Sequence, residues 1–432
     1  MIGIADVSSS CVRPSDNASG KAVSARKEAF VPQTFSPLQR LSALARYGFP
    51  FAWGKPPSRI VQLRRHNLRE RFRSRSAVQR IALYLFCSLA YPIFTAIEVR
   101  RNLALLRRTH PAAGPLAAWR MFLLAIKGNV PPFSYVFYEF EDPSRRALWP
   151  EYLYWTDRDA LKMLNRLRGA NPLDVQDKVR FAQICKEHLL PHAEAIAVFR
   201  PGNPAALALD DLEDGAELWI KPIDLQASVG AECWSFADGL FASNDGRHFG
   251  SEEFLAYLRA RTCLVQRRLK NHTAIDPITN GWLATLRIVV ALRGDGTAAL
   301  LGNALALPRG HFITSSSAFI CAVGWDDGTI FQVQDPTLPG RAAPPDLRHS
   351  DTGQVLCGHT VPFWRESLEL VQRAHRTAFP CFATLGWDVA ITPDGPLLLE
   401  TNSGWGDQQL QAVFGPLGKT VLTEIISEEL PR

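Results

Sequence analysis

Residues 386–402 read GWDVAITPDGPLLLETN, and they are the most informative segment of the chain. Two apolar segments flank Pro393-Asp394-Gly395, which is typical of a tight turn, so the stretch predicts a β-hairpin. Glu400 and Asn402 are two residues apart, and on a strand their side chains therefore leave the same face. Asp388 can lie opposite them on the partner strand. The hairpin is expected to gather two carboxylates and an amide on one face.

Carboxylate and amide oxygens are the hard ligands that Mg²⁺ prefers, and phosphate oxygens and waters can complete its octahedron. The alternative is a solvated hairpin face, where Asp and Glu are common. Leu397-Leu398-Leu399 runs directly into Glu400, which indicates a buried strand, and buried unpaired carboxylates are costly. We therefore interpret Asp388, Glu400 and Asn402 as Mg²⁺ ligands. Two metal ions that bridge ATP phosphates would use all three.

Short apolar runs separated by RGDG, DDG and PDG turns, with helical segments between them, indicate an α+β architecture with antiparallel strands. The pattern WDVAI, DG and LLLETN resembles the metal-binding hairpin of ATP-grasp enzymes, whose last strand ends in Glu-x-Asn. This resemblance implies an ATP-grasp fold, in which two α+β subdomains enclose a nucleotide cleft. It also implies ATP as the cofactor together with Mg²⁺.

Two lysines fit the same resemblance. Lys221 ends the apolar strand ELWIKP (217–222), and the family places here a phosphate-binding lysine followed by a flexible loop, residues 223–230 in this chain. A lysine is a compact point charge that suits phosphate oxygens, although a strand-end lysine can also simply extend into water. Lys178 opens a helical segment and fits the family's upstream lysine loosely, against an exposed helix lysine as the alternative.

The segment LVQRRL (264–269) resembles the hinge between the subdomains, where adenine meets the backbone after a strand. The resemblance assigns Gln266, Arg267 and Leu269 to nucleotide binding; the alternative is an ordinary edge strand. Arg287 lies in the apolar strand TLRIVV and needs a partner there. The resemblance implies a catalytic role facing the phosphates or the acyl-phosphate, and the alternative is a salt bridge to one of the hairpin acids.

Residues 348–364 narrow the resemblance. RHSDTG, a later glycine and VPFW precede a helix and the GWDVAI strand, and this order resembles the sugar-transfer-associated ATP-grasp family, described as related to α-L-glutamate ligases. The resemblance spans roughly 130–415, although Thr314–Ser317 departs from the Asp-Asn element that the pattern has before a glycine pair. It implies a ligase that activates a small-molecule or glycan-linked carboxylate as an acyl-phosphate for attack by an amine-type acceptor. It also implies a role in polysaccharide biosynthesis at the cell surface.

The charge of the chain is uneven. The 432 residues carry a formal charge of +6, yet residues 1–110 hold 19 Lys or Arg against 5 Asp or Glu. The remaining chain is mildly acidic, which argues against a nucleic-acid partner. We expect a disordered tail at 1–35, a helical and aromatic region at 36–156 whose aromatic end packs onto the C-terminal part of the chain, and the ATP-grasp domain at 157–432. The eight cysteines form no CxxC pair, which favours a reduced, cytoplasmic protein.

Residues 81–99 are almost entirely apolar and lie between arginines. They can form a buried helix, a helix that spans a bilayer, or a helix that contacts the inner membrane surface through residues 59–101, where the neighbouring arginines suit anionic lipids. Three other functions stay open at this point. They are a phosphotransferase on the same fold, a non-catalytic membrane-associated nucleotide-binding protein, and RNA binding through the arginine-rich stretch.

Overall fold

The structure is a computed structural model that describes residues 55–202, 207, 212–223, 230–310, 318–335, 342–406 and 408–430. The chain divides into two units, and all of these residues belong to the second, Ser42–Arg432. The predicted tail at 1–35 lies outside the described residues, as does most of the predicted phosphate loop.

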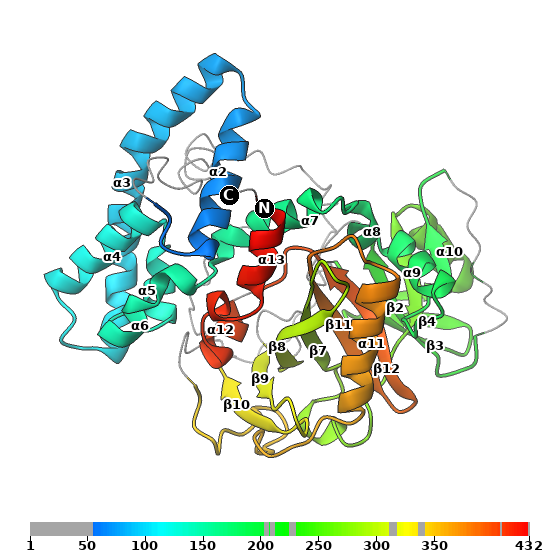
Figure 1. Ribbon diagram of the computed structural model, residues 1–432. Coiled ribbons are helices and arrows are strands. Elements are labelled where there is room, and N and C mark those ends of the chain that lie inside the picture. The colour runs from blue at the N-terminus through cyan, green and yellow to red at the C-terminus, as the bar shows by residue number, and fades with distance from the viewer. Residues whose placement is uncertain are drawn as a thin grey trace, which may run out of the picture. The chain divides into compact units, whose positions relative to one another are not determined.

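The N-terminal region is helical, as predicted (Figure 1). Its helices are α2 (Arg59–Arg73), α3 (Ala77–Thr109), α4 (Pro115–Gly128), α5 (Pro132–Phe137) and α6 (Pro143–Ala147). The side chain of Ser58 caps α2, and Ser76 and Gln79 form a capping box at the start of α3, which satisfies amide groups that the first helical turn leaves free.

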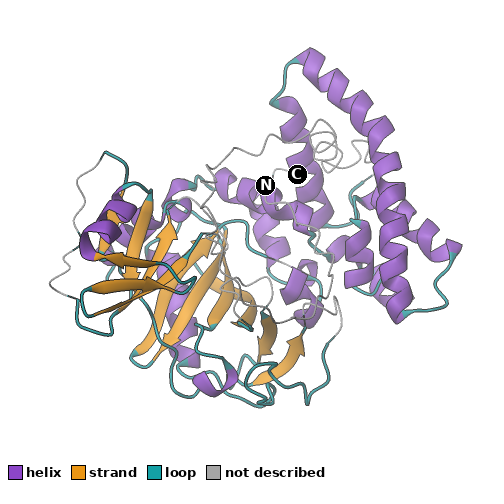
Figure 2. Cartoon of the chain, turned by 180° about the vertical axis from the view of Figure 1, so that it is seen from behind, coloured by secondary structure: helices purple, strands orange, loops and turns teal. Residues whose placement is uncertain are grey.

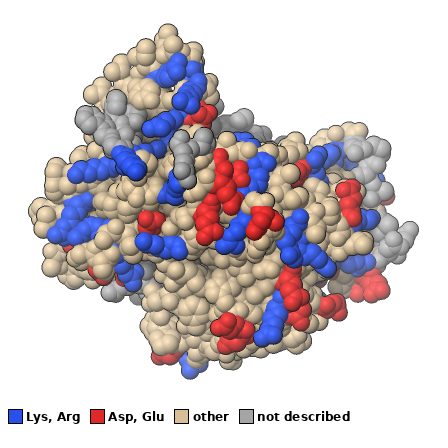
Figure 3. Space-filling model, in the orientation of Figure 1, with Lys and Arg blue, Asp and Glu red and all other residues tan. Residues whose placement is uncertain are grey.

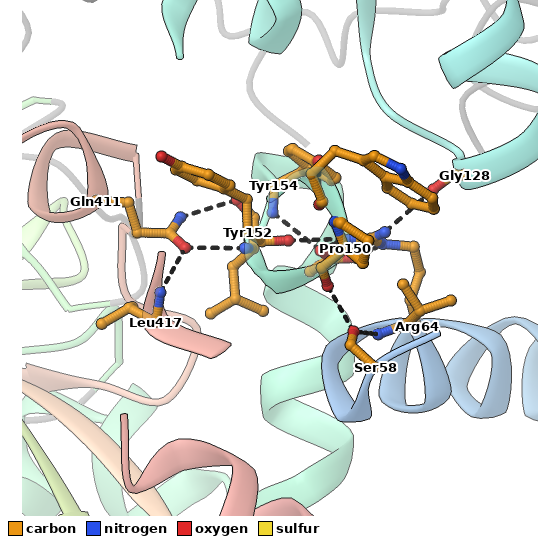
Figure 4. Close-up of polar contacts among 12 residues, drawn as sticks. Ser58, Arg64, Gly128, Pro150, Tyr152, Tyr154, Gln411 and Leu417 are labelled. Carbon is orange, nitrogen blue, oxygen red and sulfur yellow. Dashed lines mark hydrogen bonds and ion pairs between the residues drawn. The ribbon is translucent and has the colours of Figure 1, made fainter. Parts of the chain in front are cut away.

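The aromatic segment joins this region to the rest of the chain, as predicted. Tyr135, Tyr138 and Tyr154 are fully buried in a cluster with α3 and α4. The amide of Gln411, on α12 (Gln408–Phe414), donates to the Tyr138 hydroxyl and to the Leu153 carbonyl, both at 2.9 Å (Figure 4). Its oxygen accepts from the Leu153 and Leu417 backbone amides. A fully satisfied buried amide thus ties the two ends of the described chain together.

The first sheet is antiparallel with strand order β1-β6-β2-β3-β4-β5. Its strands are β1 (Ala197–Phe199), β2 (Glu217–Pro222), β3 (Glu232–Ala237), β4 (Leu240–Ser243), β5 (His248–Gly250) and β6 (Cys263–Arg267). Helix α10 (Ser251–Arg259) packs on it, and the rings of Phe241 and Phe254 stack with centroids 3.8 Å apart in its core. This sheet holds the predicted Lys221 strand and the predicted hinge strand side by side.

The second sheet has the order β10-β9-β8-β7-β11-β12 and is also antiparallel (Figure 2). Its strands are β7 (Thr285–Leu292), β8 (Ala298–Leu307), β9 (Phe319–Val323), β10 (Ile330–Gln334), β11 (Thr384–Thr392) and β12 (Gly395–Asn402). The three predicted turns join neighbouring strands, and Gly296, Gly328 and Gly395 take positive φ there, which glycine adopts without steric cost. The antiparallel α+β architecture is therefore confirmed.

Helices cover both faces of the second sheet. Helix α11 (Trp364–Thr377) packs on one face together with α9 (Lys178–Glu187), through a core that includes Trp387. Helices α7 (Arg158–Leu167) and α13 (Leu422–Glu429) pack on the other through Leu161, Leu164 and Ile425. Because strand residues alternate between faces, Trp387 enters one core while Asp388 points the opposite way.

The arginine-rich stretch is not a uniformly solvated face. Helix α2 buries Ile60 and Leu63 in the same core cluster as α13. Arg64 is also buried, and its guanidinium forms a two-pronged ion pair with Asp157 at 2.8 and 2.6 Å (Figure 4). Arg71 pairs with Asp159 at the surface. These two arginines hold α2 against the start of α7, so α2 packs across the predicted domain boundary at 156/157, which stays a prediction.

The apolar segment 81–99 lies within α3, and the interpretation of a buried helix is wrong for one of its faces. Among the described residues, α3 is the one helix long and apolar enough to cross a bilayer, and only 17% of its apolar window is buried. The exposed side chains form a row at helical spacing: Val78, Ile81, Leu85, Leu89, Ile93 and Ile97, which are 45% to 78% exposed. The opposite face packs on α4 and α5 through Val99 and Leu106.

Candidate active site

The predicted hairpin forms, and its acids are neighbours. Strands β11 and β12 pair antiparallel, with Asp388 directly opposite Glu400 and Gly386 opposite Asn402. A bulge comes next along β11, because the register shifts between Asp388 and Val389. A bulge lets a strand re-aim a side chain while the pairing continues on both sides. The prediction that Asp388 lies opposite the Glu400–Asn402 strand is confirmed.

Arg287 lies on β7, directly opposite Asp388 on β11. Its Nε and Nη2 donate to the two Asp388 carboxylate oxygens at 2.7 and 2.6 Å. Burial lowers the pKa of Arg287, but the charge of Asp388, its hydrogen bonds to Arg287 and the charge of Glu400 together raise that pKa above its usual value. The salt bridge that the sequence allowed therefore exists. It uses only two of the three guanidinium nitrogens, and no partner of Nη1 is found among the described residues.

Glu400 and Asn402 are half-buried beside this ion pair. The Asn402 amide donates weakly to a Glu400 carboxylate oxygen at 3.4 Å, and no basic side chain pairs with Glu400 among the described residues. Two carboxylates and an amide fit a magnesium ion by their chemistry, since each Asp388 oxygen keeps a lone pair beyond its bond to Arg287. Within the described ranges no group of three or more His, Cys, Asp or Glu could hold a metal. The magnesium assignment thus depends on Asn402 and on ligands from a nucleotide.

Lys221 reaches this hairpin from the first sheet. Burial and the charge of Lys178 lower its pKa, whereas the charges of Glu400 and Asp388 act to raise it. The Lys178 ammonium donates to the Pro222 and Ile223 carbonyls at 3.1 and 3.3 Å, where the predicted phosphate loop begins. A pocket is lined by Lys178 together with Glu400 and Asn402. Lys178 of α9 therefore lies beside Glu400 and Asn402, and Lys221 of the first sheet is close enough for the charges of both hairpin acids to act on it.

The predicted hinge residues serve different roles. Gln266 is buried, and its side-chain amide donates to the Ala193 carbonyl at 2.7 Å, so this side chain braces the protein. Arg267 is exposed at the end of β6, and Leu269 is half-buried just beyond it. Since adenine would meet backbone groups here, their assignment to nucleotide binding stays a prediction.

Sequence reasoning missed a basic row on α7. Arg158, Lys162 and Arg166 succeed one another at four-residue spacing, which places them on one face of the helix. The segment after β12 runs along this face: a side-chain carbon on Gly404 would lie 2.7 Å from the Lys162 side chain, and one on Gly406 would lie 3.8 Å from Arg158. The glycines at 404 and 406, directly after the Glu-x-Asn strand, were the sequence signal for this close approach.

Comparisons with known proteins agree with this fold. A model of the sugar-transfer associated ATP-grasp family matches residues 165–425. Among solved structures, D-alanine–D-alanine ligase from Bacillus anthracis complexed with ATP is similar, with 12% identity, a TM-score of 0.31, and coverage of 60% of this chain and 67% of that one. Carboxyaminoimidazole ribonucleotide synthase from Aspergillus clavatus complexed with ATP has 15% identity, a TM-score of 0.31, and coverage of 53% and 44%.

An L-amino acid ligase from Bacillus licheniformis is 13% identical, with a TM-score of 0.32 and coverage of 63% of this chain and 53% of that chain. This chain thus spans about half the length of two of these three structures. No curated protein matches it.

Proposed function

Because this chain belongs to the sugar-transfer associated ATP-grasp family, we propose that it is an ATP-dependent ligase that activates a carboxylate for attack by an amine. The observation that carries the proposal is the Arg287–Asp388 ion pair, which lies opposite Glu400 on one sheet. The charges of Glu400 and Asp388 also act to raise the pKa of Lys221 on the other sheet. Arg287 of one sheet and Lys221 of the other would then neutralise the negative charge of the ATP phosphates. The role in cell-surface polysaccharide biosynthesis is part of the proposal, and its support is the association with sugar transfer in the family's description.

The reaction has two steps. A carboxylate oxygen of the substrate attacks the γ-phosphorus of ATP, the bond from that phosphorus to the bridging oxygen breaks, and ADP leaves. The amine nitrogen of the acceptor then attacks the acyl carbon, the carbon–oxygen bond to phosphate breaks, and the nitrogen loses a proton to solvent. An amide and inorganic phosphate are the products.

The chain's own residues hold charge during these steps. Lys221 neutralises phosphate oxygens as a point charge. Arg287 offers Nη1 to the transferred group, while Nε and Nη2 stay fixed on Asp388, so the guanidinium is oriented before the substrate arrives. Mg²⁺, held by Glu400 and Asn402 with Asp388 sharing its oxygens, would neutralise charge on the phosphates when bound.

Product analysis tests this function. We expect that purified protein, incubated with ATP, magnesium and a pool of amino acids and sugar acids, forms ADP, phosphate and a product that has lost one water. Mass spectrometry of the mixture, with ¹⁸O-labelled carboxylates, would show one labelled oxygen in the released phosphate. A stable phosphoester with no free phosphate would instead identify a phosphotransferase, and the absence of any ATP turnover would favour a non-catalytic nucleotide-binding protein.

We also propose that the enzyme is cytoplasmic and contacts an anionic membrane surface through α3. The exposed row from Val78 to Ile97 extends over roughly 28 Å of helix at 1.5 Å per residue. Leu116 and Trp119 of α4 are exposed as well. Arg73, Arg75, Arg100 and Arg101 are exposed at the two ends of the row, and basic side chains are frequent over this helical region in Figure 3. The apolar row can contact lipid tails, and the arginines at its two ends can pair with anionic headgroups.

Vesicle sedimentation tests the membrane contact. We expect the protein to sediment with vesicles that contain phosphatidylglycerol, and the double variant Leu85→Gln/Leu89→Gln to bind about tenfold more weakly, since each leucine loses apolar burial in the bilayer. The matched control is Leu240→Gln/Phe331→Gln, which alters two exposed apolar side chains far from α3 in the sequence. Equal sedimentation of all three proteins would contradict a lipid partner. A wild-type dimer that dissociates only in Leu85→Gln/Leu89→Gln would contradict it as well, because the row would then bind a second copy of the chain.

A further inference from the structure

The second basic group near the site is the row Arg158, Lys162 and Arg166 on α7. These residues lie outside or at the edge of the range that the family model matches, 165–425. The row has few anions to balance it. No carboxylate pairs with Arg158 or Arg166 among the described residues, and Lys162 has only Asp159, one turn away, at 3.8 Å. Asp159 also pairs with Arg71. The row therefore carries unbalanced positive charge.

Arg158, the first residue of this row, lies near Arg287. A side-chain carbon on Gly406 would lie 3.8 Å from Nη2 of Arg158 and 3.8 Å from Nη1 of Arg287. The two nitrogens are thus no further apart than twice that distance, and both lie near a residue that has no side chain. Nη1 is the Arg287 nitrogen that does not bond to Asp388. No carboxylate pairs with these two nitrogens among the described residues, and two guanidinium groups this close to each other suit a ligand with an anionic group.

A pocket lies further along α7, beside the other two residues of the row. Lys162, Arg166, Gln176 and Ser403 line it together with apolar residues, and no carboxylate contributes to its lining among the described residues. Gln176 also lines the pocket of Lys178, Glu400 and Asn402. The basic row and the proposed phosphate site are therefore neighbours that share one wall. A molecule held by the row would lie next to the transferred phosphoryl group.

We propose that Arg158 and Lys162 bind an anionic group, a carboxylate or a phosphate, on the second substrate of the reaction, and so select an acceptor that is itself acidic. This inference rests on the proposed ligase function, because it assigns the nucleophile's binding site within that reaction. Arg287 then binds the transferred phosphoryl group, and Arg158, which also lies near Gly406, holds the acceptor. A neutral acceptor would leave the row unpaired and bind weakly.

The test uses the full chain and two variants. Calorimetric titrations with inorganic phosphate and with succinate are performed on protein saturated with magnesium and a non-hydrolysable ATP analogue. We expect the wild-type protein to bind at least one of the two anions, and Arg158→Gln/Lys162→Gln to bind it at least tenfold more weakly with an unchanged affinity for the nucleotide. Arg376→Gln, which alters an exposed arginine of α11 on the other face of the sheet, should behave like the wild type. Whichever probe binds more tightly identifies a phosphate or a carboxylate as the preferred group.

Three outcomes would overturn the inference: no anion binding by the nucleotide-loaded wild-type protein, equal anion affinity in Arg158→Gln/Lys162→Gln, or a parallel loss of nucleotide affinity, which would make the row part of the ATP site. Failure of the proposed function looks different, because the wild-type protein would then form no amide and release no free phosphate from ATP, whatever the anion titrations give. The same titrations on nucleotide-free protein would still decide whether Arg158 and Lys162 hold an anion.

Discussion

Glu400→Gln is expected to lower ATP turnover at least about 100-fold while the fold stays intact. The substitution keeps the size of the side chain and removes one negative charge. Glu400 is the hairpin carboxylate that forms no ion pair among the described residues, so the substitution breaks no salt bridge. A neutral amide is a weaker ligand for Mg²⁺ than a carboxylate, and the charge that positions the metal beside the phosphates is lost. Phosphate release measured at saturating ATP gives the readout.

The matched control for this variant is Asp394→Asn, which removes one negative charge from the exposed turn of the same hairpin. It should turn over ATP like the wild type. Urea unfolding of both variants checks that the hairpin is intact. If Glu400→Gln keeps wild-type turnover, Glu400 is not a metal ligand and the proposed centre is wrong.

Asp388→Asn would be a less informative test of the metal. Both Asp388 oxygens accept from Arg287, so this change removes a metal ligand and also releases a guanidinium. Breaking a buried ion pair from one side leaves an uncompensated charge, and the resulting loss of stability would obscure the catalytic effect. Asp388 and Glu400 lie opposite each other in the hairpin, but only Asp388 has an arginine partner among the described residues.

The hairpin could be predicted from the sequence because its information is local. Alternation of side chains, the Pro393-Asp394-Gly395 turn and the two-residue spacing of Glu400 and Asn402 together define which side chains share a face. The strand that carries Lys221 was predictable for the same reason. The sequence could also state that Arg287 needs an anion, since its strand neighbours are apolar.

Contacts between distant segments could not be predicted in this way. Asp388 is opposite Arg287 because β7 pairs with β11, and the strand order of a sheet is not written in the periodicity of either strand. The amphipathic pattern of α7 predicted a helix but did not show that its basic face would meet the segment of Gly404 and Gly406. For Gln266 the sequence position fits a hinge, but in the structure its side-chain amide donates to the Ala193 carbonyl.

Arg64 illustrates how composition can mislead. It stands among six arginines within twelve residues, a pattern that suits solvent or a charged surface. In the fold its guanidinium donates to Asp157, to the Gly128 carbonyl and to the Tyr152 carbonyl, and it lies 4.5 Å from the centre of the Tyr154 ring. Ile60, Leu63 and Arg64 lie on one face of α2. This helical spacing is the sequence feature that indicates the burial of Arg64.

Arg64→Ala is expected to lower the free energy of unfolding by about 3–5 kcal/mol, because it leaves Asp157 as a buried carboxylate without its cation. Asp157 is 2% exposed and would keep only the Tyr154 backbone amide, at 2.9 Å, among the polar contacts that the structure describes. Urea unfolding followed by fluorescence measures the change. Arg73→Ala, on the same helix, is the control: its exposed pair with Glu70 should contribute less than about 1 kcal/mol.

The double variant Arg64→Ala/Asp157→Ala separates the ion pair from the packing of α2. It should be less destabilised than the sum of the two single variants, since no buried charge is left behind. Asp157 directly precedes Arg158, the first residue of α7, so the α2 arginine also fixes where the basic row begins. Arg64→Ala should therefore weaken anion binding under conditions in which the protein is still folded. A variant with wild-type stability and wild-type anion affinity would show that α2 neither supports the core nor positions the proposed acceptor site.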